Sequence, residues 1–163
     1  MSDFGWDLEK EEQSNKFIFL EYSPEKIKMM LDEGGGSIES LVLRHKVTRI
    51  VIDSITSFTL LFDTEIEKRT AALGLFEMIK KWQCTTLLTV QHDPLKEEKA
   101  DISLLEFEVD GIILLYFKKA KNKRERSIEV IKMRGTYHST KVHIFEIKDL
   151  SLIHISEPTR PVP

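Results

Sequence analysis

The sequence predicts an α/β protein whose sheet is parallel at its centre and is finished by antiparallel strands. Three short apolar runs are typical of strands buried on both faces of a parallel sheet, and a long helical pattern separates the first two. Two later segments alternate between apolar and polar residues, as half-buried strands do. The apolar runs cover residues 48–53, 85–90 and 112–117, and the alternating segments cover residues 127–133 and 141–147.

Composition places the chain among ordinary one-domain globular proteins. It has 163 residues and a net charge of −3, which gives no overall attraction to nucleic acid or to a membrane surface. Cys84 is the only cysteine, so we expect no internal disulfide and a reducing, cytoplasmic location. No stretch of the sequence is long and apolar enough to span a membrane.

The first part of the chain predicts one strand and two short helices. Residues 16–22 are largely apolar and are expected to form a strand. Ser23 followed by Pro24 marks the start of a helix, because serine caps helices and proline suits their first position. Gly34-Gly35-Gly36 ends this helix, and Ser37 is expected to cap the next one.

The long helix between the first two apolar runs has the clearest local signal. Thr64 and Glu67 have the spacing of a capping box, in which each side chain bonds to the backbone of the other. The helix is expected to extend to about Trp82. Its inner stripe is predicted to be Ala72, Leu75, Phe76, Ile79 and Trp82.

Asp53 directly follows the first apolar run, in Arg49-Ile50-Val51-Ile52-Asp53-Ser54. Open α/β sheets bind ligands at the carboxyl ends of their strands, so this carboxylate is a candidate metal or phosphate-site residue. An ordinary strand end is the alternative interpretation. Gln91 ends the second apolar run and is expected to lie nearby.

Lys132 and Arg134 lie two residues apart on a predicted strand, so they are expected to point to one face. Lysine supplies a point charge and arginine a fork of donors, and together they suit a polyphosphate. A solvated strand face is the alternative. The basic segment 118–126 could contact DNA or RNA, but we favour a solvated hairpin tip because no aromatic residue interleaves its cations.

Four motifs in order resemble the KaiC-like branch of the RecA superfamily of P-loop ATPases. The resemblance covers about residues 1–149, and it implies a RecA-like fold and binding of ATP with Mg²⁺. The motifs are Phe4-Gly5-Trp6-Asp7, Ile50-Val51-Ile52-Asp53-Ser54, Asp110-Gly111-Ile112-Ile113 and Lys132-Met133-Arg134-Gly135-Thr136-Tyr137-His138.

The resemblance implies a role for each matching residue. Asp53 would be the Walker B carboxylate that holds Mg²⁺, followed by Ser54, and Gln91 would occupy the position of a γ-phosphate sensor. Lys132 and Arg134 would reach the nucleotide held by a neighbouring subunit of a homo-oligomeric ring and stabilise the transferred phosphoryl group. His138 matches the histidine that follows this motif in the family.

One motif of the family is missing. The sequence contains no Gly-x-x-x-x-Gly-Lys-Ser/Thr loop, and no Lys-Ser/Thr follows Gly34-Gly35-Gly36. We therefore expect residues 1–149 to be the C-terminal two-thirds of the ATPase domain, incomplete at the N-terminus and inactive alone. An incomplete sheet exposes strand edges, so we also expect the isolated chain to be marginally stable or to associate.

Residues 150–163 match no structural periodicity and resemble a translated sequencing adapter, so we expect a non-native or disordered tail. The sequence is most simply interpreted as a fragment of a KaiC-like ATPase that hydrolyses ATP at subunit interfaces. Two alternatives stay open. One is a non-catalytic assembly or regulatory module, and the other is a DNA-associated, recombinase-like ATPase.

Overall fold

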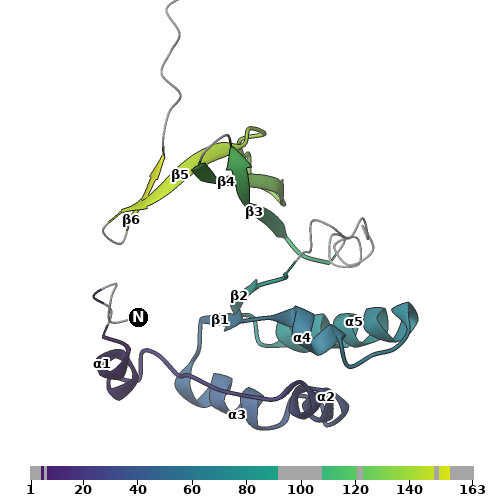
Figure 1. Ribbon diagram of the computed structural model, residues 1–163. Coiled ribbons are helices and arrows are strands. Elements are labelled where there is room, and N and C mark those ends of the chain that lie inside the picture. Colours follow the sequence, from purple (N-terminus) through teal and green to yellow (C-terminus); the bar gives the residue numbers. More distant parts are fainter. Residues whose placement is uncertain (1–4, 6, 92–107, 121–122, 149–150, 155–163) are drawn as a thin grey trace, which may run out of the picture. The chain divides into compact units, whose positions relative to one another are not determined.

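The computed structural model describes residue 5 and residues 7–91, 108–120, 123–148 and 151–154. The chain divides into two compact units, a helical unit of residues 11–108 and a strand unit of residues 1–10 and 109–163. Helix α1 (Leu8–Gln13) crosses this division. The described strands form two sheets, one of two strands and one of four (Figure 1). Mixed α/β structure with parallel and antiparallel pairing was predicted, and it is confirmed.

The helical unit is built on a parallel pair of strands. β1 and β2 pair in register from Arg49 opposite Thr85 to Ile52 opposite Leu88, and the chain between them is helical, as parallel pairing requires a long connection. Its elements are α2 (Pro24–Asp32), α3 (Gly36–His45), β1 (Arg49–Ile52), α4 (Ile55–Thr59), α5 (Glu65–Lys81) and β2 (Thr85–Leu88).

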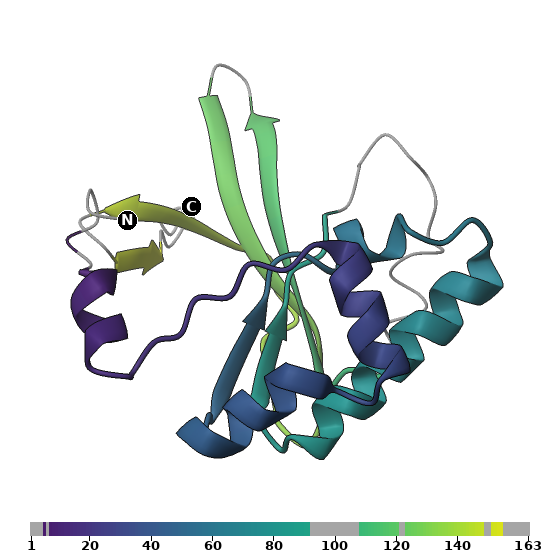
Figure 2. The same ribbon diagram turned by 90° about the horizontal axis from the view of Figure 1, so that it is seen from below.

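The buried core described in the structure lies in this unit. Helix α2 contacts α3, α4 and α5, and Figure 2 shows these helices beside the strand pair. Ile55 is the most deeply buried large side chain, at 1% exposure. The buried hydrophobic residues are Met30, Val42, Ile55, Phe58, Ala72, Leu75, Phe76, Met78 and Ile79.

The predicted helix starts are confirmed at two of three positions. Ser23 caps α2 with Pro24 in its first turn, and Thr64 and Glu67 form the complete capping box of α5. Ser37 was wrongly predicted to cap α3. The cap is Gly35, whose φ of 109° is in the left-handed region that glycine adopts without strain, and it offers no capping side chain.

Three burial and strand predictions are wrong. Residues 16–22 are extended but form no strand in the described structure, because a strand needs a hydrogen-bonded partner. β1 and β2 are not buried on both faces, since the helices cover only the face of Ile50 and Ile52, and Val51 and Leu87 are 64% and 62% exposed. Trp82 is half-buried rather than part of the core.

The strand unit is an antiparallel sheet in the order β3-β4-β5-β6. β3 and β4 form a long hairpin, in which Phe117 lies opposite Arg126 and Leu115 opposite Ile128. β6 lies within the segment expected to be a tail, and its backbone pairs with β5. No described helix is long and apolar enough to cross a membrane. The strands are β3 (Gly111–Ala120), β4 (Lys123–Met133), β5 (His143–Lys148) and β6 (Ser151–His154).

Candidate nucleotide-binding site

Asp53 lies at the carboxyl end of β1 with its side chain exposed. Its Oδ1 accepts a hydrogen bond from the hydroxyl of Thr89, the residue that follows β2. The pairing of Ile52 with Leu88 explains this contact, because the next residue of each parallel strand then lies at the same edge of the sheet. Carboxylate and hydroxyl oxygens thus meet where ligands bind in open α/β sheets.

Backbone hydrogen bonds fix the two strand ends to each other. The Thr89 amide donates to the Ile52 carbonyl at 3.0 Å, and the Ile55 amide donates to the Thr89 carbonyl at 3.1 Å. Ser54 lies between them at the N-cap position of α4, and its hydroxyl forms no cap hydrogen bond. The turn that carries Asp53 is therefore held against the end of β2.

Gln91 belongs to the same edge. Its backbone amide donates to the Thr56 hydroxyl at 2.9 Å, so the chain leaving β2 is tied to α4. The Gln91 side chain is exposed. The structure thus brings together three of the predicted residues, Asp53, Ser54 and Gln91, in one unit.

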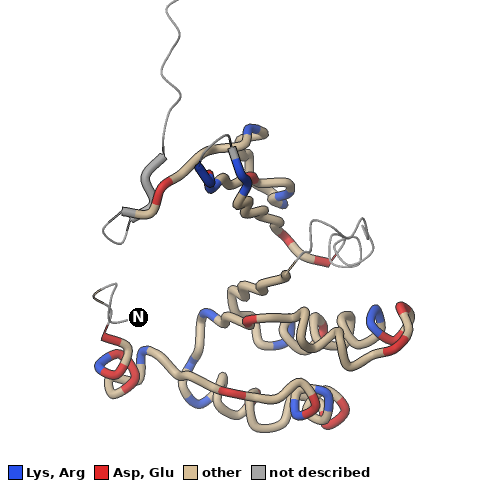
Figure 3. Tube along the Cα trace, in the orientation of Figure 1, with Lys and Arg blue, Asp and Glu red and all other residues tan. Residues whose placement is uncertain are grey.

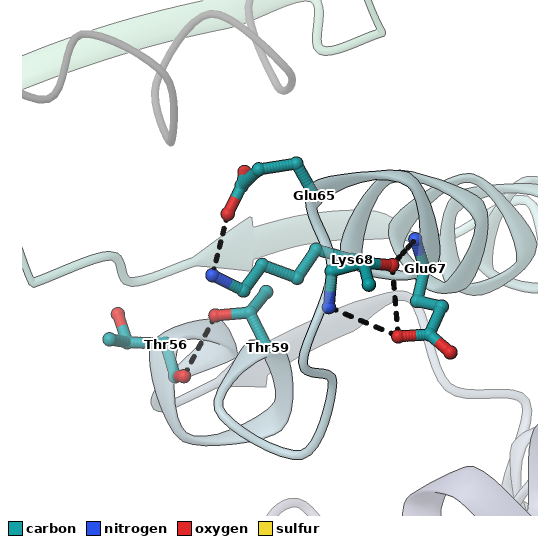
Figure 4. A network of polar contacts seen from close by, with 6 residues as sticks. Thr56, Thr59, Glu65, Glu67 and Lys68 are labelled. Carbon is teal, nitrogen blue, oxygen red and sulfur yellow. Dashed lines mark hydrogen bonds and ion pairs between the residues drawn. The ribbon is translucent and has the colours of Figure 1, made fainter.

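A polar network continues from this edge into α5 (Figure 4). The Thr59 hydroxyl donates to the Thr56 carbonyl at 2.9 Å. At the start of α5, Lys68 forms an ion pair with Glu65 at 2.7 Å, next to the Thr64–Glu67 capping box. Glu67 has a lowered pKa because the backbone and hydroxyl of Thr64 donate hydrogen bonds to its carboxylate.

The oxygen donors at the end of β1 fit a magnesium ion bound together with a nucleotide. Mg²⁺ prefers oxygen ligands, and in nucleotide sites it is held by one or two carboxylates, waters and the phosphates themselves. Asp53 supplies the carboxylate. No cluster of three histidine, cysteine or acidic residues that could hold a metal alone occurs in the described part of the chain. His92 and Asp93, which we did not expect to bind metal, lie outside the described residues.

Lys132 and Arg134 lie at the end of β4, in the strand unit. Lys132 is half-buried on β4, and Arg134 follows the last strand residue, Met133. Gly135 has a φ of 67°, so the turn after Arg134 uses a conformation that glycine adopts most easily.

Asp110 holds Arg134 in place. The Arg134 amide donates to the Asp110 carbonyl at 2.7 Å, and its Nη1 lies 3.3 Å from the Asp110 carboxylate. Both side chains are largely exposed, at 52% for Arg134 and 88% for Asp110, so the guanidinium stays accessible to an anion. His138 is half-buried, and its Nδ1 lies 3.2 Å from the Ser139 carbonyl oxygen.

The sequence analysis missed three residues: Thr89, Thr56 and Asp110. The in-register parallel pairing could have indicated Thr89, because Asp53 and Thr89 each come directly after a strand. Asp110 precedes β3 as Arg134 follows β4, so an antiparallel pairing of those strands could have indicated the ion pair. Nothing in the spacing of Thr56 distinguishes it from the neighbouring hydroxyl residues.

Comparison with known proteins identifies the family. A family profile described as "ATPase: KaiC" matches residues 1–160. The chain belongs to the KaiC family of ATPases. This KaiC-family chain is 31% identical over 160 residues to the circadian clock oscillator protein KaiC of Prochlorococcus marinus, covering 93% of this chain and 31% of that protein.

Archaeal proteins are similar along the same region. A UPF0273 protein of Pyrococcus furiosus is 31% identical over 166 residues, covering 94% of this chain and 66% of that protein. The crystal structure of a KaiC-like protein from Pyrococcus horikoshii superposes with a TM-score of 0.77 at 29% identity, covering 96% of this chain and 68% of the other. The fold is therefore RecA-type, as the motifs predicted. The chain spans about a third of the length of the KaiC protein it matches.

Proposed function

We propose that this chain provides the metal-binding edge and the trans-acting cations of an ATP site in a KaiC-family assembly. The observation that supports this most directly is the meeting of Asp53 and Thr89 at the carboxyl ends of β1 and β2. Asp53 acts as the Walker B carboxylate toward Mg²⁺, with Ser54 beside it and Gln91 facing the γ-phosphate. ATP is the nucleotide, and the compartment is the cytoplasm.

Lys132 and Arg134 act on ATP bound to a neighbouring copy in a homo-oligomeric ring. Arg134 is already oriented by Asp110 and remains exposed, which suits a guanidinium that stabilises charge on a transferred phosphoryl group. His138, close after them in sequence, belongs to the same nucleotide-facing set.

The metal-binding part is tested with Mn²⁺–ATP as a paramagnetic probe in place of Mg²⁺–ATP. Titrating the ¹⁵N-labelled chain should broaden the amide signals around Asp53 and Thr89. Asp53→Asn should abolish this broadening, whereas Asp32→Asn, at an exposed carboxylate of the same unit, should leave it. Equal broadening in the Asp53→Asn variant would contradict the assignment.

The trans-acting part is tested by association that depends on a non-hydrolysable ATP analogue. Sedimentation velocity should show larger species when the analogue is added, and Arg134→Ala should weaken their formation. Lys141→Ala, at an exposed cation of the same unit, is the matched control. If Arg134→Ala assembles as the unchanged chain does, Arg134 makes no contact with nucleotide held by a neighbour.

A non-catalytic assembly module is the second candidate, and the absence of a Gly-x-x-x-x-Gly-Lys-Ser/Thr sequence favours it. Backbone amides and a lysine of that loop hold the phosphates, and Asp53 supplies only the metal side. The two candidates differ in the fluorescent ATP-analogue titration. Saturable Mg²⁺-dependent binding that Asp53→Ala removes supports nucleotide binding by this chain, whereas association without any nucleotide binding supports the module.

A further inference from the structure

The β3–β4 hairpin separates its charged residues by face. Antiparallel pairing puts Lys118 opposite Glu125 and Phe117 opposite Arg126, so alternate residues lie on opposite sides of the sheet. The face of Lys118 carries all the acidic residues of the paired segment, Glu125 and Glu129. The opposite face, which we name the cation–aromatic face, carries Ile113, Leu115, Phe117, Lys119, Arg124, Arg126, Ile128 and Val130.

The charges on the acid-bearing face are paired. Lys123 forms an ion pair with Glu125 at 2.9 Å. The Tyr116 hydroxyl donates to the Glu129 carboxylate at 2.8 Å, and Lys118 lies over the Tyr116 ring at 4.5 Å. These contacts raise the pKa of Lys123 and of Tyr116. This face is therefore internally neutralised.

The cation–aromatic face has no such compensation. Among the residues that the structure describes, no carboxylate forms an ion pair with Lys119, Arg124 or Arg126. Two of these cations instead lie over one ring, with the guanidinium carbons of Arg124 and Arg126 at 5.2 Å and 4.9 Å from the Phe117 centroid. Phe117 stays 53% exposed. In Figure 3 the blue positions along β3 and β4 mark the cations of both faces.

The pairing of β4 with β5 extends the pattern to a third strand. Arg126 lies opposite Phe145, so Phe117, Arg126 and Phe145 form one row across three neighbouring strands. Ring, guanidinium and ring alternate in this row. The sequence analysis rejected nucleic acid because no aromatic residue interleaved the cations, and strand pairing supplies that interleaving from outside the basic segment.

We propose that the cation–aromatic face binds single-stranded nucleic acid. Single strands are held without sequence preference by cations that follow the phosphates and by aromatic rings and guanidinium planes on which unpaired bases stack. Lys119, Arg124 and Arg126 supply the phosphate contacts, and Phe117 with its stacked arginines supplies the platform. An acidic peptide would use the cations but leave the exposed ring without a partner, so it fits the face less well.

The test is a fluorescence anisotropy titration of the full chain with dye-labelled oligothymidylate at several salt concentrations. Three phosphate contacts predict a slope of about −2 in log affinity against log salt. Arg124→Gln with Arg126→Gln should reduce this slope to about −0.7, and Phe117→Leu should weaken binding by about fivefold to a hundredfold. A duplex of the same sequence should bind less tightly, since its bases are already stacked.

Two controls make the outcome decisive. Arg44→Gln with Lys81→Gln removes two exposed cations of the helical unit, and binding should not change. Circular dichroism checks that each variant folds as the unchanged chain does. The proposal is overturned if the oligonucleotide does not bind at low salt, or if binding survives both hairpin substitutions. It is also overturned if those substitutions abolish self-association without nucleic acid and leave oligonucleotide binding intact, because the face would then be an interface between copies.

Discussion

Thr89 determines how the Asp53 carboxylate is presented. Its hydroxyl donates to Asp53 Oδ1, which directs the other oxygen toward the edge of the sheet. We expect Thr89→Val to weaken Mn²⁺–ATP binding by about tenfold, the usual effect of losing a group that orients a metal ligand. Thr89→Ser keeps the hydroxyl and should bind normally. If valine and serine behave alike in the titration, the hydrogen bond does not position the carboxylate.

Tyr116 should titrate later than the other two tyrosines. Its pKa is raised from the ordinary 10.0 mainly because its hydroxyl donates to Glu129, and also by burial and by the negative charge of that carboxylate. A raised folded-state pKa stabilises the fold below the unfolded-state value, and this contribution is lost as the pH rises through the folded-state value. Ultraviolet titration of tyrosinate should show one late transition that Glu129→Gln removes. Three coincident transitions would contradict the hydrogen bond.

At the scale of elements, the start of α5 depends on the capping box. Thr64→Ala should destabilise the chain by about 1 kcal/mol, measured by urea unfolding, whereas Thr64→Ser should cost little. The lowered pKa of Glu67 means that its contribution is present above its unfolded-state pKa and is lost as the pH falls through the folded-state value. The penalty of Thr64→Ala should therefore shrink below the ordinary glutamate value of 4.5. A constant penalty would show that Glu67 does not take part.

Elements with local signals were predictable from the sequence, and elements that depend on partners were not. Ser23 and Thr64 start helices through contacts within four residues, so their spacing was sufficient. Residues 16–22 have the composition of a strand but no described partner, and composition does not reveal partners. The exposure of Val51 and Leu87 likewise depends on what covers the sheet, which the apolar run does not encode.

The same distinction applies to the candidate site. Asp53, Lys132 and Arg134 were identified from motifs, because each motif is continuous in the sequence. Thr89 and Asp110 were missed, since their contacts arise from strand register and join residues that are 36 and 24 positions apart. The register of a short strand is set by pairing, so these contacts became visible only with the fold.

At the scale of the whole molecule, exposed apolar side chains predict self-association. Val51 and Leu87 lie opposite each other on one face of the parallel pair, and 64% and 62% of their surfaces are exposed. We expect the purified chain to form concentration-dependent oligomers in sedimentation velocity, and Val51→Lys with Leu87→Lys to reduce them. The matched substitution Leu43→Lys, at a residue 70% exposed on α3, should have less effect. A monomer that unfolds cooperatively at high concentration would refute this expectation.

The two-faced hairpin also sets which mutations β4 can accept. Residues 123, 125, 127 and 129 lie on the acid-bearing face, and residues 124, 126, 128 and 130 on the other. If the cation–aromatic face is under selection for anion binding, tolerance to new acidic residues should alternate along the strand with a period of two. A saturation scan selected for oligonucleotide binding would then record the two faces as two independent sets of positions within one continuous segment.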